Sequence, residues 1–363
     1  MQAALRDTGA MPGEAAGENE GFSHEVEPQT LRYVADDEPG IGRKRAGRGF
    51  FYVKPDGKKV TEVADLARFR SLAIPPAWED VWICLYANGH LQATGRDARG
   101  RKQYRYHPEF RQQRDEVKYE RLLGFAHVLP KIRAAVANHM GLRGLPKEKV
   151  LATVVHLLEI TLIRIGNADY AKQNKSYGLT TLRNSHVRIE GTNLRFQFKG
   201  KSGKTWRLQI SDRRIAKLVR SCQELPGQQL FQYLDEDGKQ QGVASSDVNA
   251  YLLEISGATV TAKDFRTWAG TVAAAQALHE IGAAETKTAA RKNMRRIIER
   301  VAAKLGNTVA ICRQCYVHPQ ILDAYMAGEL TLGTARCKGD APHGLSAEER
   351  AVMLFLKSRK QTA

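Results

Sequence analysis

The stretch CRQCYVHPQIL places Tyr316 between a Cys-x-x-Cys pair and a histidine, near the carboxyl end of a basic chain. Tyr316 could be a packed ring, a neighbour of a metal site, or a nucleophile. Zinc normally has four ligands, and structural sites usually pair two Cys-x-x-Cys units. Cys312 and Cys315 have no such second pair, although His318 and Cys337 could complete a set. We therefore expect no metal site here and consider the nucleophile.

A tyrosine phenol can attack a phosphodiester without a metal ion if other groups handle the charge. The pentacoordinate transition state carries extra negative charge on its non-bridging oxygens, which suits two planar guanidiniums. The departing 5′ oxygen leaves poorly unless it is protonated, and a lysine with a lowered pKa could protonate it. Residues of these types stand in distinct motifs: Arg164 in LIRIGN, Lys201 in GKSGK and Arg266 in KDFRTWAG. Asn307, in KLGNT, precedes Tyr316 by nine positions (316 − 307).

The elements that must position these residues can be predicted from apolar periodicity. LPKEKVLATVVHLLEITLIRIG predicts a central helix that stops at Gly166 and has Arg164 near its end. The alternating runs HVRIE, LRFQFK and TWRLQI predict a small antiparallel sheet with Lys201 on its tight loop. Helices with Ser or Thr caps follow, of which one begins just before Arg266 and another ends at Gly306.

These patterns divide the chain into three parts and predict an α+β fold. Residues 1–27 are rich in Gly, Ala and Glu without apolar periodicity, which is typical of a disordered acidic tail. Residues 28–112 contain mostly short β-like runs with turn signals, which predict a small β-rich amino-terminal domain. Residues 113–363 predict a mainly α-helical domain that contains the small antiparallel sheet.

The charge of the chain points to a polyanion. The formal net charge is +17; residues 1–27 contain one Arg against one Asp and five Glu, or −5, so the remainder carries +22 (17 + 5). Such a body attracts nucleic acid, although a basic protein without that partner remains possible. No apolar run approaches the roughly 18 residues of a membrane span, and no signal sequence is evident. Five scattered cysteines fit a reducing compartment, so we expect a cytoplasmic protein.

Over roughly residues 30–330 the chain resembles type IB DNA topoisomerases, specifically their compact bacterial and poxvirus-like branch. The resemblance rests on the joint order of ATGRDARGRKQYRYH, IRIGNADYAKQNKSYGLTTLRNSHV, FKGKSGK, KDFRTWAGT and VAAKLGNTVAICRQCYVHPQIL. It implies an enzyme that relaxes supercoiled duplex DNA by transient single-strand cleavage and religation, with no ATP, cofactor or required metal. It also implies a monomer associated with the nucleoid.

The resemblance assigns a role to each candidate. Tyr316 would attack DNA to form a 3′-phosphotyrosyl bond, while Arg164 and Arg266 would clamp the scissile phosphate. Lys201, helped by Lys263, would protonate the leaving oxygen. These assignments follow from the family's motifs and from the matching positions of this sequence.

Asn307 departs from the family, which commonly has a histidine at this position. An amide can donate one hydrogen bond to a non-bridging oxygen, but it cannot be an imidazolium. We therefore expect the chemistry to survive with Asn307, at a lower rate.

The resemblance also implies contacts with DNA. The amino-terminal domain would close over one side of the duplex, and the SYGLTTLRNSHV region would add contacts with the DNA backbone. In GRKQYRYHPEFR, basic residues could contact phosphates and tyrosines could pack on sugars or bases, although an ordinary exposed strand has the same pattern. The residues concerned are Arg101, Gln103, Tyr104, Tyr106, Lys175 and Arg183.

Two other functions share part of this pattern. A tyrosine recombinase shares the Arg, Lys, Arg and Tyr residues, but it usually carries His-x-x-Arg where this chain has Lys263-Asp-Phe-Arg266. A non-catalytic nucleic-acid-binding protein would need no particular residue at position 316. Relaxation of plasmid DNA would distinguish the topoisomerase from both.

Overall fold

The computed structural model describes residues 30–333 and 343–361, so the predicted acidic tail, residues 1–27, lies outside these ranges. The chain divides into two compact units, Met1–Asp115 and Glu116–Ala363. The helix α2 (Pro108–His139) contains the boundary between them. Within the described ranges, no helix is both long and apolar enough to span a membrane.

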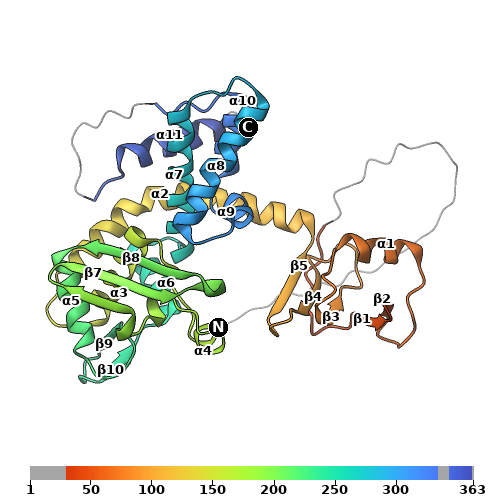
Figure 1. Cartoon of the computed structure of the whole chain (residues 1–363), viewed down its shortest axis with the longest axis horizontal. Helices are drawn as coiled ribbons and strands as arrows, with labels where there is room; N and C mark the ends of the chain where they lie inside the picture. Colours follow the sequence, from red (N-terminus) through yellow and green to blue (C-terminus); the bar gives the residue numbers. More distant parts are fainter. Residues whose placement is uncertain (1–29, 334–342, 362–363) are drawn as a thin grey trace, which may run out of the picture. The chain divides into compact units, whose positions relative to one another are not determined.

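The first unit is built on a five-stranded sheet with the strand order β2-β1-β3-β4-β5 (red to orange in Figure 1), and the strands are paired antiparallel. Its elements are β1 (Ile41–Ala46), β2 (Gly49–Val53), α1 (Val63–Ser71), β3 (Glu79–Ile83), β4 (Leu91–Arg96) and β5 (Lys102–Tyr106). The predicted β-rich character is therefore confirmed.

The helix α1 was not indicated by the strand-like patterns of this unit. Asp65 lies in its first turn, and Arg68 and Arg70 lie in its last turn, an arrangement that complements the helix dipole. The helix also buries Phe69, which packs against Tyr52 with 4.8 Å between the ring centroids. Tertiary burial and terminal charges together stabilise a short helix that lacks a strong apolar period.

The second unit is mainly helical, as the sequence predicts. After α2 its longer helices are α3 (Lys147–Thr161), α5 (Arg213–Gln223), α6 (Ser245–Ser256), α7 (Ala262–Ile281), α8 (Lys287–Leu305), α10 (Pro319–Ala327) and α11 (Ala347–Gln361). Its shorter elements are α4 (Ala168–Asn174), η1 (Leu179–Thr181), η2 (Asn184–His186), η3 (Lys201–Gly203), β9 (Gln232–Leu234), β10 (Gln240–Gly242) and α9 (Val309–Cys315).

The predicted small sheet is also confirmed. It consists of β6 (Val187–Glu190), β7 (Asn193–Lys199) and β8 (Thr205–Ser211), paired antiparallel in the order β6-β7-β8. Along β7, Leu194, Phe196 and Phe198 are buried, whereas the residues between them are exposed. This alternation turns one face of the sheet toward the core and fixes the register of the hairpin, whose tip carries Lys201.

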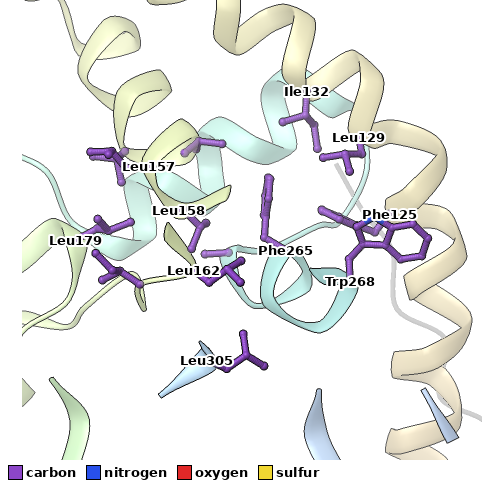
Figure 2. Close-up of a cluster of buried hydrophobic side chains, with 14 of the residues drawn as sticks. Phe125, Leu129, Ile132, Leu157, Leu158, Leu162, Leu179, Phe265, Trp268 and Leu305 are labelled. Carbon is purple, nitrogen blue, oxygen red and sulfur yellow. The ribbon is translucent and has the colours of Figure 1, made fainter. Parts of the chain in front are cut away.

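The core of the second unit lies between α2, α3 and α7 (Figure 2). Phe125 of α2 packs edge-on against Phe265 of α7, with 4.9 Å between the ring centroids. Leu158 of α3 is fully buried in the same cluster. Burial of one such side chain contributes about 1.5–3 kcal/mol to folding stability. This cluster therefore fixes the position of α7 relative to α3 and the residues that follow it.

The helix α3 ends earlier than the sequence predicts. It ends at Thr161, and Leu162 adopts a left-handed conformation (φ 56°, ψ 19°) as its C-cap. The predicted stop at Gly166 is therefore wrong, because a leucine rather than a glycine takes the left-handed position. Arg164 consequently lies past the helix, in a segment that is neither helix nor strand.

The helix α8 ends where the sequence predicts. Its buried residues include Ile298, Val301, Ala302 and Leu305, which recur at helical spacing and face the core. Gly306 forms a left-handed C-cap (φ 62°, ψ 36°), a conformation that glycine adopts without a steric penalty. The chain therefore turns sharply just before Asn307.

Candidate active site

Five of the residues singled out in the sequence line one cavity of about 430 Å³ in the second unit: Arg164, Lys201, Lys263, Arg266 and Tyr316. They come from the segment after α3, the tip of the β7–β8 hairpin, the first turns of α7 and the end of α9. The structure thus brings together side chains that lie up to 152 positions apart in the sequence (316 − 164).

Tyr316 is the C-cap of α9, and its backbone N–H donates to Cys312 O at 2.9 Å. Its half-buried ring lies beside Arg266, whose guanidinium carbon is 5.2 Å from the ring centroid. Gly270 of α7 supports the backbone of Tyr316, because a Cβ at position 270 would lie 2.4 Å from Tyr316 O. Only glycine permits this close approach between α7 and the nucleophile candidate.

Three further hydrogen bonds hold the segment around Tyr316. The hydroxyl of Tyr119, on α2, lies 3.0 Å from Gln314 O and 2.9 Å from Val317 O, the carbonyls that flank Tyr316. The backbone N–H of His318 donates to Thr271 Oγ1 at 3.1 Å. The ends of the segment are therefore tied to α2 and α7.

The last carbonyl of α8 and those of the two residues after it accept hydrogen bonds from three cations. The last carbonyls of a helix lack intrahelical partners and form the negative end of its dipole, so they accept hydrogen bonds from cationic side chains. The pairs are Arg266 Nη2 to Leu305 O at 2.8 Å, Arg164 Nη2 to Gly306 O at 3.2 Å, and Lys204 Nζ to Asn307 O at 2.9 Å. These carbonyls orient both guanidiniums.

The two guanidiniums have no carboxylate partner within the described ranges. Arg266 is only 3% exposed, and burial lowers its pKa to about 10, an effect that the neighbouring Tyr316 phenol opposes. Burial also lowers the pKa of the half-buried Arg164. Both remain cations near neutral pH. Because a buried cation without a counter-charge is unfavourable, the cavity is suited to an anionic ligand.

Asn307 is connected to the site through Arg164, whose Nη2 donates to Asn307 Oδ1. Asn307 is buried, and in the described part of the chain its Nδ2 has no hydrogen-bond partner; the same holds for Arg266 Nε. Buried donors normally have partners. These two donors, one on the Arg266 guanidinium itself and the other on the amide that contacts Arg164, therefore indicate a place for acceptor oxygens.

The lysines stand at the exposed rim of the cavity. Lys201 forms part of the short η3 turn at the hairpin tip, and Lys263 lies in the first turn of α7. The hydrogen bonds of Asp264 with the backbone and hydroxyl of Thr261 define the start of that helix. Both ammonium groups can thus approach a ligand from the solvent side.

Sequence reasoning missed two aromatic residues of the cavity, Tyr170 and Tyr177. Both fall inside the quoted motif IRIGNADYAKQNKSYG, but a motif does not show which ring faces a cavity. Asn167 places Tyr170 by capping α4, since its Oδ1 accepts from Tyr170 N at 2.8 Å.

Lys175 and Arg183 line a neighbouring hollow of about 950 Å³, which shares Asn167 and Tyr177 with the first cavity. The guanidinium carbon of Arg183 lies 5.4 Å from the centroid of the Tyr177 ring. Lys175 is exposed and left-handed (φ 48°) as the C-cap of α4. The two cations therefore border a groove that continues from the cavity.

The remaining candidates belong to the first unit and form two pairs. Arg101 Nε and Gln103 Nε2 donate to Asp97 Oδ2 at 2.8 and 2.9 Å, and Arg101 contributes most to lowering the pKa of Asp97 to about 2. Tyr104 and Tyr106 stack with 6.0 Å between the ring centroids. Because side chains alternate along β5, Gln103 lies on the opposite face from the tyrosines.

The Cys-x-x-Cys pair belongs to α9. Cys312 is fully buried, and burial raises the pKa of its thiol to about 11. Across the residues that the structure describes, no three His, Cys, Asp or Glu side chains are grouped as metal ligands would be.

Comparison with known proteins defines the class to which this fold and site belong. Residues 107–330 match the family described as eukaryotic DNA topoisomerase I, catalytic core, and residues 49–97 match the bacterial DNA topoisomerase IB, N-terminal domain. The chain therefore belongs to the type IB DNA topoisomerase family. It is an isomerase that relaxes supercoiled DNA by transient single-strand cleavage and religation, as the sequence predicts.

Several viral proteins that resemble this chain are named as DNA topoisomerases. The chain is 33% identical over 293 residues to DNA topoisomerase 1B of Acanthamoeba polyphaga mimivirus. This alignment covers 79% of this chain and 87% of the relative. Over 166 residues it is 25% identical to DNA topoisomerase I of monkeypox virus and to DNA topoisomerase 1B of vaccinia virus (strain Copenhagen). Those alignments cover 44% of this chain and 53% of each relative.

Proposed function

We propose that Tyr316 is the nucleophile with which this topoisomerase cuts one DNA strand. The observation that carries the proposal is the cavity that Tyr316 shares with Arg164 and Arg266, two guanidiniums without a carboxylate partner in the described residues. A phosphodiester would supply the missing negative charge. Its transition state carries still more charge, so the guanidiniums would bind it more tightly than the ground state.

The chemical step exchanges one phosphate ester for another. The phenol oxygen of Tyr316 forms a bond to phosphorus, the bond from phosphorus to the 5′ oxygen breaks, and the phenol proton leaves to solvent. Lys201, helped by Lys263, gives a proton to the departing 5′ oxygen, so protons balance. The products are a 3′-phosphotyrosyl bond and a free 5′-hydroxyl. Reversal of the same step reseals the strand without ATP.

Asn307 would complete the contacts of the scissile phosphate. Its Oδ1 is occupied by Arg164, whereas its buried Nδ2 has no partner among the described residues. An amide donor held in this way can give a hydrogen bond to a non-bridging oxygen without first leaving another partner. This arrangement supports a role for Asn307 where relatives commonly have histidine.

The contacts with duplex DNA are part of the same proposal. The β-rich domain, residues 28–112, would clamp the duplex through Arg101, Gln103, Tyr104 and Tyr106. The catalytic domain, residues 113–363, would add Lys175 and Arg183, which border the groove beside the cavity. Residues 1–27 would be a disordered acidic tail. The net charge of +17 supports nonspecific attraction to phosphates, and we place the enzyme in the bacterial cytoplasm as a nucleoid-associated monomer.

The substitution Tyr316→Phe tests the nucleophile assignment. It removes only the attacking oxygen, so we expect loss of relaxation of supercoiled plasmid with DNA affinity retained. Tyr233→Phe is the matched control, because Tyr233 lies in β9 and is absent from the residues that line the cavity. A Tyr316→Phe enzyme that relaxes plasmid as fast as wild type would exclude Tyr316 as the nucleophile.

A further inference from the structure

The hairpin that carries Lys201 is joined to the turn that carries Asn307 by the side chain of Trp206. A Cβ at Gly200 would lie 2.6 Å from Trp206 Nε1, and a Cβ at Gly306 would lie 2.7 Å from Trp206 Cζ2. The indole is therefore in close contact with two glycines at once. One glycine directly precedes Lys201 and the other directly precedes Asn307.

Lys204 makes a second connection between the same two segments. Its Nζ donates to Asn307 O at 2.9 Å. Since Asn307 O follows the carbonyls that hold Arg266 and Arg164, Lys204 attaches the hairpin tip to the place where the two guanidiniums are oriented. The hydrogen bond has a charged donor, which makes it stronger than one between neutral groups.

The tip itself is a closed turn. Gly200 N–H donates to Lys204 O at 2.8 Å, and Gly203 N–H donates to Gly200 O at 3.0 Å. Ser202 and Gly203 are both left-handed, with φ of 64° and 74°. Lys201 therefore lies in a tight loop whose two ends are each connected to the Asn307 turn, Gly200 through Trp206 and Lys204 through its own hydrogen bond.

We propose that Trp206 and Lys204 are positioning residues that hold Lys201 within reach of the departing 5′ oxygen. A general acid must come within hydrogen-bonding distance of the atom it protonates, and displacement of a reacting group by about 1 Å can cost about 10²-fold in rate. A hairpin tip held only by its own strands would allow such displacement. This inference rests on the role of Lys201 proposed above.

A substrate that needs no acid separates this role from a general structural one. In DNA whose scissile 5′ oxygen is replaced by sulfur, the phosphorus–sulfur bond breaks and a thiolate departs. A thiol ionises with a pKa of about 8.5, so the thiolate leaves without receiving a proton. Cleavage of this substrate therefore depends on Tyr316 and the guanidiniums, but no longer on the placement of Lys201.

The experiment measures single-turnover cleavage of the oxygen and sulfur substrates by the full chain. Lys204→Met should slow cleavage of the oxygen substrate about tenfold, as expected for loss of one charge-assisted hydrogen bond. Trp206→Phe should slow it about 10- to 100-fold through displacement of the tip. Both variants should cleave the sulfur substrate within about twofold of wild type, and Lys204→Arg should restore the oxygen rate.

Two further variants make the outcomes distinguishable. Lys199→Met removes an exposed lysine from the opposite strand of the same hairpin and should change the two rates equally. The sulfur substrate should also restore the cleavage rate of Lys201→Ala. If Lys201→Ala cleaves the sulfur substrate slowly, the acid role of Lys201 is wrong, and the inference is wrong with it. Rescue of Lys201→Ala without rescue of Lys204→Met and Trp206→Phe would overturn the inference alone.

Discussion

The contact between Gly270 and Tyr316 predicts a large kinetic effect from a single methyl group. In Gly270→Ala the new Cβ would lie 2.4 Å from Tyr316 O and 3.2 Å from Leu305 Cδ1. Since real Cβ contacts essentially never fall below 3.0 Å, the carbonyl of Tyr316 must move by at least about 0.6 Å (3.0 − 2.4). A displacement approaching 1 Å costs about 10²-fold, so we expect cleavage to slow about 10- to 100-fold.

Single-turnover cleavage of a short duplex measures this rate directly, and DNA affinity measured in a Tyr316→Phe background separates binding from chemistry. The guanidiniums of Arg164 and Arg266, which we propose bind the scissile phosphate, are held mainly by carbonyls of other segments. DNA affinity should therefore stay within about threefold of the wild-type value. The matched control is Gly124→Ala on α2, where an added Cβ would have no neighbour within 4 Å among the described residues. Alanine favours a helix over glycine, so Gly124→Ala should fold and cleave normally.

A Gly270→Ala enzyme that cleaves at the wild-type rate would refute the reasoning, because the backbone of Tyr316 would then not depend on α7. A melting temperature close to that of wild type would show that slow cleavage does not come from unfolding. Equal loss of affinity and of rate would also contradict the expected separation.

Three further substitutions test other contacts of the site. Arg266→Lys keeps the charge but loses the planar fork that reaches Leu305 O, so single-turnover cleavage should fall about 10²-fold; a change under threefold would contradict this. Asn307→Ala removes the unused Nδ2 donor and should slow cleavage about 10-fold, and unchanged rates would remove Asn307 from the site. Tyr119→Phe removes the hydroxyl that contacts the carbonyls flanking Tyr316, so it should slow cleavage of the oxygen and sulfur substrates equally. A selective effect on one of the two substrates would contradict this role of Tyr119.

Local patterns predicted the elements that have a clear apolar alternation or a glycine at their end. The alternation in LRFQFK and TWRLQI revealed the hairpin, and Gly306 marked the end of α8 because glycine favours the left-handed C-cap. The predicted end of α3 was wrong because Leu162 takes the left-handed C-cap position, which leucine rarely occupies and which the sequence therefore does not indicate. The helix α1 was missed because its stability comes from burial of Phe69 and from terminal charges rather than from periodicity.

The convergence of the site could not be derived from local patterns at all. Side-chain chemistry and resemblance to a family connect four residues of the sequence, Arg164, Lys201, Arg266 and Tyr316. The cavity that these residues share, however, depends on long-range packing. The contacts of Trp206 with Gly200 and Gly306 depend on distances between segments about 100 positions apart, for which the sequence contains no periodic signal. The same holds for the bridging hydroxyl of Tyr119.

The most direct test of the central claim is to trap the covalent intermediate. The full chain is incubated with supercoiled DNA in the presence of EDTA and quenched with detergent, and the DNA-linked peptide is identified by mass spectrometry. We predict that Tyr316 is joined to a 3′ phosphate and that the other strand end is a free 5′-hydroxyl. Attachment through another residue, attachment to a 5′ phosphate, or a complete dependence on divalent metal would contradict the account.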